Sequence, residues 1–280
     1  MSNRKQRIRR HFNRSAAGTY DKHANVQRYM ADRLSQTLKK QARPEEPPAL
    51  QILEIGCGTG TLTEMLANEW PNSMITALDM APEMLKAAEL RLHLGSGRSH
   101  IRFLHADVED WASEAPAGSF DLIVANACFQ WLGEPSETLR NLQGLLRSEG
   151  MLVFTTFGPD TFRELHEAFN AVYYANGNVP QRHGLTFQSV SEWKDMLAEA
   201  GYSAIQAESS TQIEMFTSVR EFLHAVKAVG ASASEAAEFR GLSTRSLFTN
   251  MYMEYEKKFS LPEGISVTYE LLLFQAHAAT

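Results

Sequence analysis

Apolar residues recur at helical spacing in the N-terminal part of the chain. Ile8 and Phe12 lie four residues apart in a polar segment, and the same spacing runs through four apolar residues between positions 26 and 38. This period predicts two amphipathic helices. The proline-rich segment 43–48 stops helix formation. We therefore expect residues 1–48 to form an N-terminal helical arm, or lid, in front of the core.

Short apolar runs alternate with helical segments in the middle of the chain. The runs span residues 50–55, 74–78, 101–104, 120–125 and 151–156, and the intervening helices are predicted at 61–70, 82–94 and 138–146. Runs of this length are typical of buried parallel strands. Their alternation with helices predicts right-handed β-α-β crossovers and a doubly wound α/β sheet. We assign residues 49–157 to this core.

The alternation becomes less regular after residue 157. Helices are predicted at 162–174, 191–200 and 219–229, and two further strands at 203–216 and within 261–278. These strands bring the predicted sheet to seven, mostly parallel. We expect residues 158–280 to complete the sheet and to add a helical cap from the segments 158–188 and 231–262, all within one structural domain.

Composition and charge narrow the class of protein. The 280 residues carry 27 Lys and Arg against 33 Asp and Glu, a net charge of −6. This balance argues against a broadly basic nucleic-acid binder. The N-terminus lacks the apolar stretch of a secretory signal, and no run of 18 apolar residues suggests a membrane span. We expect a soluble cytoplasmic protein that binds neither nucleic acid nor membrane.

The two cysteines, Cys57 and Cys128, lie far apart in apolar segments. Neither belongs to a C-x-x-C pair or to a Cys/His spacing that would hold zinc. Such sparse use of cysteine is typical of a reducing compartment. The sequence therefore predicts neither a disulfide framework nor a bound metal.

A glycine-rich loop, EIGCGTG (54–60), joins the first predicted strand to its helix. Gly56, Gly58 and Gly60 allow the backbone to turn tightly and to approach a ligand closely. The dinucleotide fingerprint needs a glycine at position 61, where Thr61 stands, and the G-K-[ST] ending of a phosphate-binding P-loop is missing. The GxGxG spacing after Glu54 instead resembles motif I of the class I S-adenosylmethionine-dependent methyltransferases, which have a Rossmann-like fold.

Three polar residues follow later strands in the order that suits this cofactor. Asp79 ends the second strand, where an acid can accept both ribose hydroxyls. In the family, the position of Asp107 reads the adenine amino group, and Asn126 ends the fourth strand at the ligand-binding edge. Structural alternatives stay open: Asp79 can cap a helix, Asp107 can cap a loop, and the nearby Phe129 or Trp131 can be part of the core.

The resemblance implies a full set of cofactor contacts. Glu54 would anchor the loop and help receive the charged methionine end, while Met80 and Met84 would flank the adenine. The implied contacts are Tyr20, His23, Gln27, Glu54, Gly56, Cys57, Gly58, Gly60, Asp79, Met80, Met84, Asp107, Val108, Asn126 and Phe129.

A narrower resemblance covers nearly the whole chain. The arm segment FNRSAAGTYDKHANVQ (12–27) is similar to the N-terminal signature of the malonyl-acyl-carrier-protein O-methyltransferases of biotin synthesis. The segments 154–157, 164–166, 226–231 and 268–272 agree with that family. The resemblance implies methyl transfer from S-adenosylmethionine to the free carboxylate of a malonyl thioester on acyl carrier protein. The resulting methyl ester primes the synthesis of a pimeloyl precursor of biotin.

This chemistry needs alignment rather than a base. A malonyl carboxyl with a pKa of about 4 or below is already ionised at neutral pH, so no proton has to leave. The candidates for positioning the substrate are Tyr20, Gln130 and Trp131, with Lys227 as a further candidate that can equally be a solvated helix lysine. Tyr20, His23 and Gln27 are where we expect the closing arm to touch the cofactor.

A basic cluster in the arm suggests a docking site for an acidic acyl carrier protein. Its members are Arg4, Lys5, Arg7, Arg9, Arg10 and Arg14. Charge complementarity would speed the encounter and set its register, but a solvated basic face is the plain alternative. Other functions also remain open: a methyltransferase for a free small acid of the trans-aconitate type, an RNA methyltransferase, or a regulatory protein that binds the cofactor without turnover.

Overall fold

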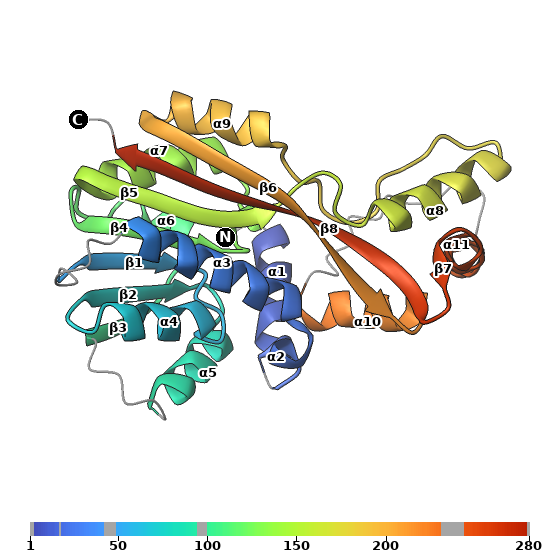
Figure 1. Cartoon of the computed structure of the whole chain (residues 1–280), viewed down its shortest axis with the longest axis horizontal. Helices are drawn as coiled ribbons and strands as arrows, with labels where there is room; N and C mark the ends of the chain where they lie inside the picture. Colours follow the sequence, from blue (N-terminus) through green and yellow to red (C-terminus); the bar gives the residue numbers. More distant parts are fainter. Residues whose placement is uncertain (1–2, 17, 42–48, 94–99, 231–243, 279–280) are drawn as a thin grey trace.

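A computed structural model describes residues 3–16, 18–41, 49–93, 100–230 and 244–278, and its α/β architecture matches the predicted fold class (Figure 1). The predicted linker at 43–48 lies outside the described residues. In chain order the elements are α1 (Asn3–Ser15), α2 (Tyr20–His23), α3 (Asn25–Gln41), β1 (Gln51–Ile55), α4 (Thr61–Glu69), β2 (Met74–Asp79), α5 (Pro82–His93), β3 (His100–His105), α6 (Val108–Trp111), β4 (Phe120–Asn126), the 3-10 turn η1 (Phe129–Trp131), α7 (Pro135–Leu145), β5 (Leu146–Phe157), α8 (Arg163–Ala175), α9 (Val190–Glu199), β6 (Tyr202–Phe216), α10 (Val219–Ala228), α11 (Thr244–Phe259), β7 (Ser260–Leu261) and β8 (Gly264–Ala278).

The sheet has the order β3-β2-β1-β4-β5-β8-β6. Strands β1 to β5 pair in parallel, and β8 runs antiparallel between β5 and β6. The predicted mostly parallel sheet of seven strands is therefore confirmed, and the two-residue β7 adds a short pairing to β8. Because the order reverses between β1 and β4, the carboxyl ends of these strands form the crevice where open α/β sheets bind ligands.

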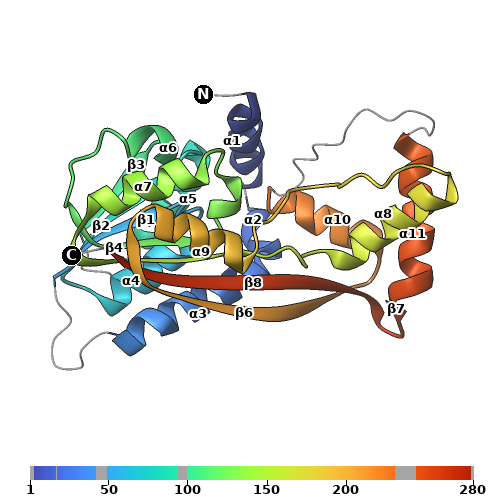
Figure 2. The same cartoon turned by 90° about the horizontal axis from the view of Figure 1, so that it is seen from above.

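Helices cover both faces of the sheet (Figure 2). On one face α3 and α4 bury Leu34, Leu66 and Trp70 against the strands. On the other face α7 and α9 bury an aromatic group that includes Phe154 and Trp193. Helix α3, the C-terminal helix of the predicted arm, thus packs directly on the sheet. The apolar spacing of residues 26–38 serves this sheet contact.

The strands β6 and β8 continue beyond the parallel sheet, and a second core forms on their extension. Helices α8, α10 and α11 pack there around Phe169, Phe222 and Tyr255 (right of Figure 1). We call these three helices, with residues 176–189, the cap. The predicted cap segments 158–188 and 231–262 contribute α8 and α11, whereas α10 joins them from outside those segments. Residues 231–243 lie outside the described part of the chain.

Two local differences from the predicted elements have backbone causes. Strand β5 begins at Leu146 and includes the predicted turn at 148–150 as an irregularity, with Glu149 left-handed at φ 64°. Helix α6 was not predicted. It is a single turn, which the side chain of Asp107 caps by accepting from the backbone N–H of Glu109.

Candidate functional site

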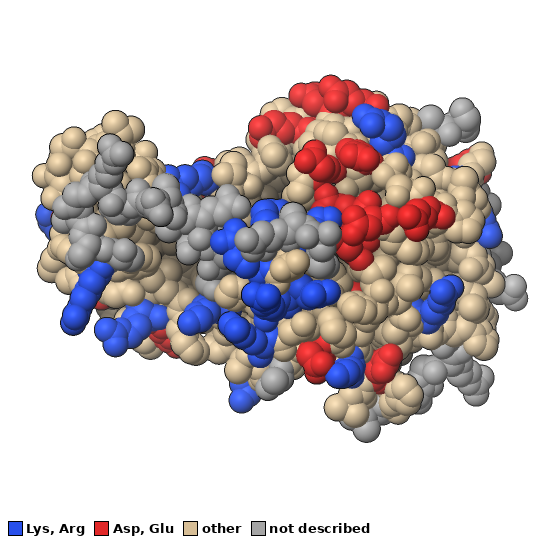
Figure 3. All heavy atoms as spheres, turned by 180° about the vertical axis from the view of Figure 1, so that it is seen from behind, with Lys and Arg blue, Asp and Glu red and all other residues tan. Residues whose placement is uncertain are grey.

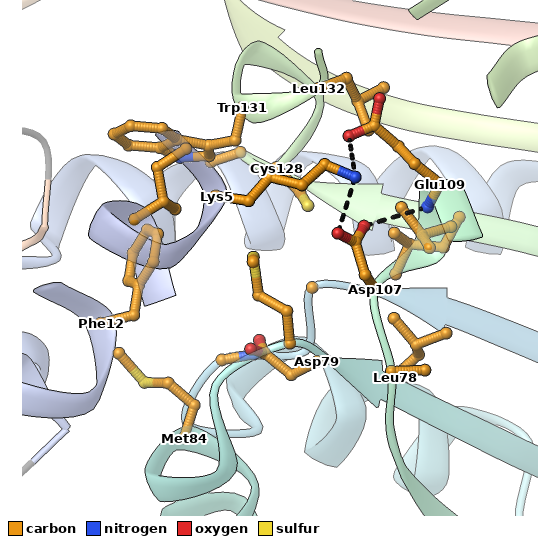
Figure 4. Close-up of a pocket in the computed structure, with 18 of the residues that line it drawn as sticks. Lys5, Phe12, Leu78, Asp79, Met84, Asp107, Glu109, Cys128, Trp131 and Leu132 are labelled. Atoms are coloured by element: carbon orange, nitrogen blue, oxygen red, sulfur yellow. Dashed lines mark hydrogen bonds and ion pairs between the residues drawn. The ribbon is translucent and has the colours of Figure 1, made fainter. Parts of the chain in front are cut away.

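A cavity of about 750 Å³ lies at the carboxyl ends of β1, β2 and β4, with α1 as its outer wall (Figure 4). Thirteen residues predicted to contact cofactor or substrate are brought together in its wall or in an adjoining recess. Those in the wall are Tyr20, Gly56, Gly58, Asp79, Met80, Met84, Asp107, Val108, Asn126 and Trp131, and those that line the recess but not the wall are Gln27, Glu54 and Cys57. We call this the first cavity.

The glycine loop owes its shape to left-handed residues. Gly56 has φ 69°, and a Cβ there would lie 2.4 Å from Cys128 Sγ. Gly58 has φ 54°, but a Cβ there would meet nothing within 4 Å, because this residue borders the open cavity. Gly60 does not line the first cavity. It precedes α4, and a Cβ there would lie 3.0 Å from Ala88 Cβ on α5, so close packing favours glycine at this position.

Asp79 ties β2 to the glycine loop. Its Oδ2 accepts from Gly58 N at 2.9 Å, and its Oδ1 accepts from Ala81 N at 2.8 Å. Burial raises the pKa of Asp79 to about 6 even though these backbone donors favour the charged form. Two oxygens with further lone pairs therefore stand at the cavity wall, where they can accept the hydroxyls of a bound ribose.

Glu54 lies in the adjoining recess, which Gln27, Tyr20 and Cys57 also line. Glu54 is buried, and among the described residues its Oε2 has no hydrogen-bond partner. Burial raises the pKa of this carboxyl to about 7. A buried carboxylate oxygen without a donor is costly, so the recess fits a ligand that brings a cationic or N–H group. The ammonium of a methionine moiety is such a group.

Helix α1 closes the first cavity from outside. Lys5, Ile8 and Phe12 lie on one face of the helix and line the cavity wall. Lys5 Nζ lies 2.7 Å from Asp107 Oδ2 and 2.9 Å from Glu109 Oε2 (Figure 4).

The inward face of α1 corrects the predicted docking role of two basic residues. Lys5 forms ion pairs inside the site, and Arg4 donates from Nη1 to the carbonyl of Trp131 at 3.0 Å. Arg7, Arg10 and Arg14 are exposed on the helix, and Arg9 is partly exposed. Because side chains of a helix point in different directions, Arg4 and Lys5 face the site while most of the other basic residues of the run face solvent.

A second cavity of about 1170 Å³ lies between the arm, the sheet edge and the cap. It shares Phe12, Tyr20, Ala127 and Trp131 with the first cavity, so the two meet there. The rings of Phe12 and Trp131 are in edge contact at 5.5 Å. The remaining wall combines polar residues, among them Lys22, Glu214 and Glu221, with the apolar residues Phe157, Phe162, Leu185, Phe187, Val226 and Val229. His23 and Gln27 also line it, on the arm side.

Some predicted site residues lie elsewhere or are already engaged. Phe129 is buried against Phe154, 4.7 Å between ring centroids, and lines neither cavity, so its core alternative holds. Lys227 is exposed on α10 and lines neither cavity. Gln130 lines the second cavity, but its amide donates to Ala127 O and accepts from Thr156 Oγ1.

The amide of Asn126 has a structural task as well. Its Nδ2 donates to Gln27 O at 2.9 Å, and its Oδ1 accepts from Thr155 Oγ1 at 2.7 Å. Asn126 therefore joins α3 to the ends of β4 and β5 while it borders the first cavity. This link fixes Gln27 of the arm relative to the sheet.

Sequence reasoning missed a clamp between α2 and the glycine loop. Thr59 Oγ1 donates to Asp21 Oδ1 at 2.6 Å, and Arg91 Nη2 lies 2.6 Å from Asp21 Oδ2. Arg91 Nε also donates to Thr59 O. The clamp holds Tyr20, the neighbour of Asp21, at the junction of the cavities. In the sequence, only the position of Asp21 within the family-like segment 12–27 pointed to this clamp.

Among the described residues, no group of three or more His, Cys, Asp or Glu side chains is arranged to hold a metal ion. Within the same residues, no helix is both long and apolar enough to cross a membrane.

The fold of the chain is shared with solved structures. The YcgJ protein from Bacillus subtilis aligns with a TM-score of 0.59 at 14% identity, over 89% of this chain and 99% of its own. A phosphoethanolamine N-methyltransferase 2 from Haemonchus contortus, solved with S-adenosylhomocysteine, aligns with a TM-score of 0.54 at 15% identity, over 88% of this chain and 52% of its own.

Sequence comparison is more specific. Residues 22–207 match the family model described as a methyltransferase domain. A malonyl-[acyl-carrier protein] O-methyltransferase from Paenibacillus sp. (strain JDR-2) is 54% identical over 99% of this chain and 100% of its own length. A protein of the same name from Brevibacillus brevis is 40% identical over 97% of this chain and 96% of its own length. The chain therefore belongs to the malonyl-[acyl-carrier protein] O-methyltransferase family of the class I methyltransferases.

Proposed function

We propose that this chain methylates the free carboxylate of a malonyl group carried on acyl carrier protein. Close relatives carry that name, and the similarity extends over the whole chain, arm and cap included. The observation that carries the proposal is the meeting of the two cavities at Tyr20 and Trp131. A cofactor in the first cavity and an acyl chain in the second would meet at this junction.

S-adenosylmethionine, when bound, supplies a methyl carbon that is electrophilic because it is attached to a positively charged sulfur. Around it, Asp79 would accept the ribose hydroxyls, and Asp107 would lie at the adenine end. Glu54 in its recess would pair with the ammonium of the methionine end, which would satisfy the unpartnered Oε2. Asp79 also holds the glycine loop, because its Oδ2 accepts from the backbone N–H of the left-handed Gly58.

The junction offers donors rather than bases. Burial raises the pKa of Tyr20 above its ordinary value, with the nearby Asp79 adding to the effect, so its hydroxyl stays protonated at neutral pH. Tyr20 can therefore donate a hydrogen bond to a carboxylate but cannot take a proton from it. A malonyl carboxylate is already ionised, so it needs orientation and no base.

Closure and an apolar wall would assist the transfer. The carboxylate oxygen, methyl carbon and sulfur must lie in line with reacting atoms about 3–3.5 Å apart. The charges of the two reactants partly cancel in the transition state, so exclusion of water should favour it. Helix α1 covers the first cavity, and the cap covers the second with Leu185, Phe187 and Val226.

The outer face of α1 is the proposed docking site for the carrier protein. Arg7, Arg10 and Arg14 are exposed there. Burial and the charge of Arg14 lower the pKa of His11 most; the charge of Lys227 on α10 also lowers it, so this lysine lies close to the same face. Basic side chains gather on this face between the core and the cap (Figure 3). An acidic carrier protein would approach beside the second cavity, which a pantetheine-linked malonyl group could enter.

An intact-mass assay tests the proposed function. Malonyl-acyl carrier protein, malonyl-coenzyme A, free malonate and trans-aconitate are each incubated with the protein and S-adenosylmethionine. A gain of one methyl, fastest on the carrier-bound malonyl group, is expected. Methylation of a free acid alone would leave the cofactor site in place but reject the carrier-protein substrate, and cofactor binding without any transfer would favour a regulatory protein.

A further inference from the structure

Helix α1 has two faces with different contacts. Lys5, Ile8 and Phe12 recur at helical spacing and line the first cavity, while Arg7 and Arg10 point to solvent. Ile8 is only 2% exposed, so the helix is packed onto the cavity rather than lying loosely above it. A ligand that fills the first cavity must therefore contact α1 or displace it.

Lys5 provides the polar contact that holds this helix in place at the adenine end. Its Nζ bridges Asp107 and Glu109 at 2.7 and 2.9 Å. Burial lowers the pKa of Lys5, but hydrogen bonds and ion pairs to the two carboxylates outweigh it and raise the pKa above its ordinary value. The pKa of Glu109 is lowered by Lys5 and by backbone donors, although burial opposes the shift. Lys5 and Glu109 therefore carry opposite charges at neutral pH.

Glu109 extends this contact to the loop after β4. Its Oε1 accepts from the backbone N–H groups of Gly133 and Glu134, at 3.0 and 2.7 Å. Arg4 donates to the carbonyl of Trp131 in the same loop. The N-terminal turn of α1 is thus bonded both to the adenine end of the first cavity and to the loop that forms the junction with the second.

We propose that Lys5 is a positioning residue for the cofactor, whose ion pairs with Asp107 and Glu109 keep α1 closed over the bound adenosyl group. This inference rests on the assignment of the first cavity to S-adenosylmethionine. The ion pairs must open for the cofactor to enter and form again behind it. Their loss should weaken cofactor binding mainly by faster dissociation, because an open helix leaves the adenine end exposed to water.

The test measures binding of S-adenosylhomocysteine, the reaction product, to the full chain by calorimetry and stopped flow. Lys5→Met removes the charge but keeps an unbranched apolar side chain. The matched control is Gln6→Met, which places the same side chain on the exposed side of the same helix. We expect Kd to rise about tenfold for Lys5→Met, the scale of losing a charge-assisted hydrogen bond, and to stay within about twofold for Gln6→Met. Lys5→Arg, which keeps the charge, should restore most of the affinity.

Amide hydrogen exchange of residues 3–15 supplies a second readout. S-adenosylhomocysteine should slow exchange in α1 of the wild type and of Gln6→Met, and should do so far less in Lys5→Met. Equal affinity and equal protection in Lys5→Met would overturn the inference. Tighter binding by Lys5→Met would also overturn it, because Lys5 would then compete with the cofactor. Failure of the wild type itself to bind S-adenosylhomocysteine would instead reject the cofactor assignment.

Discussion

The two cavities are built from different kinds of structure. The first is shaped by backbone turns at the ends of β1, β2 and β4, where Asp79 holds the glycine loop, and is covered by α1. The second is lined by apolar and polar side chains from the arm, the sheet edge and the cap, which are far apart in the sequence. The first should therefore fail when one backbone position is changed, whereas the second should respond gradually to changes in side-chain volume.

Gly56→Ala should have the largest effect, because φ is 69° and the new Cβ would lie 2.4 Å from Cys128 Sγ. We expect the free energy of unfolding to fall by about 2–4 kcal/mol and S-adenosylhomocysteine binding to be lost. Gly58→Ala is the matched control, with strain of about 1 kcal/mol and no close contact. It should keep the fold yet bind poorly, since its Cβ borders the cavity. Urea unfolding and calorimetry measure both effects, and wild-type stability in Gly56→Ala would contradict the account.

Glu54→Gln should separate stability from binding. The pKa of Glu54 is raised to about 7 by burial, so the native state favours the protonated form. That contribution to stability is present at low pH and is lost as pH rises through about 7. At pH about 8, without cofactor, Glu54→Gln should be more stable than the wild type by up to about 3 kcal/mol.

The same variant should match the wild type only below the ordinary pKa of 4.5, at about pH 4, where Glu54 is neutral in both the native and the unfolded state. Its affinity for S-adenosylhomocysteine at pH about 8 should fall, because the ammonium loses its anionic partner. Urea titrations at both pH values check the first expectation, and calorimetry the second. An equal stability difference at the two pH values would exclude a titrating Glu54 as the cause.

Val226→Phe should affect only the second cavity, which Val226 lines from α10. The larger ring would fill part of the second cavity, where we propose that the acyl chain binds. KM for malonyl-acyl carrier protein should therefore rise about tenfold. The Kd of S-adenosylhomocysteine should stay within about twofold. Ile213→Phe, on an exposed part of β6, is the control. A parallel loss of cofactor affinity in Val226→Phe would show that the two cavities are not independent.

Arg10→Gln should have the smallest effect, since exposed charges contribute to encounter more than to affinity. We expect KM for the carrier substrate to rise about threefold at low salt, and the difference to vanish at about 0.5 M salt, where exposed charges are screened. Arg102→Gln, exposed on β3, serves as the control. Steady-state kinetics at two salt concentrations measure both variants, and equal KM values would remove Arg10 from the docking site.

The same contrast explains what the sequence could predict. Strand ends meet at one edge of a parallel sheet, so the glycine loop, Asp79 and Asp107 could be grouped from their order alone. The fold class followed from the alternation of apolar runs and helices. Phe129 could not be assigned, because an aromatic residue after a strand can face either the crevice or the core, and α9 packs against it here.

The arm and the cap were harder to predict for another reason. The sequence alone does not show which residues of a basic run face the protein. Only the packing of α1 onto the strand ends shows that Lys5 faces the site whereas Arg7 and Arg10 face solvent. The clamp of Asp21 and Arg91 joins residues 70 positions apart and has no local motif. Contacts of this kind depend on packing, which periodicity does not encode.

The central claim, that an already ionised carboxylate is methylated at the junction without a base, is tested most directly by the pH dependence of a single turnover. Malonyl-acyl carrier protein is mixed with excess enzyme saturated with S-adenosylmethionine, and the methyl ester is quantified by intact mass from about pH 7.5 to 9. The account predicts a rate constant that changes less than about twofold over this range. A rate constant that rises about tenfold per pH unit would show that a proton is removed in the reaction, and would contradict it.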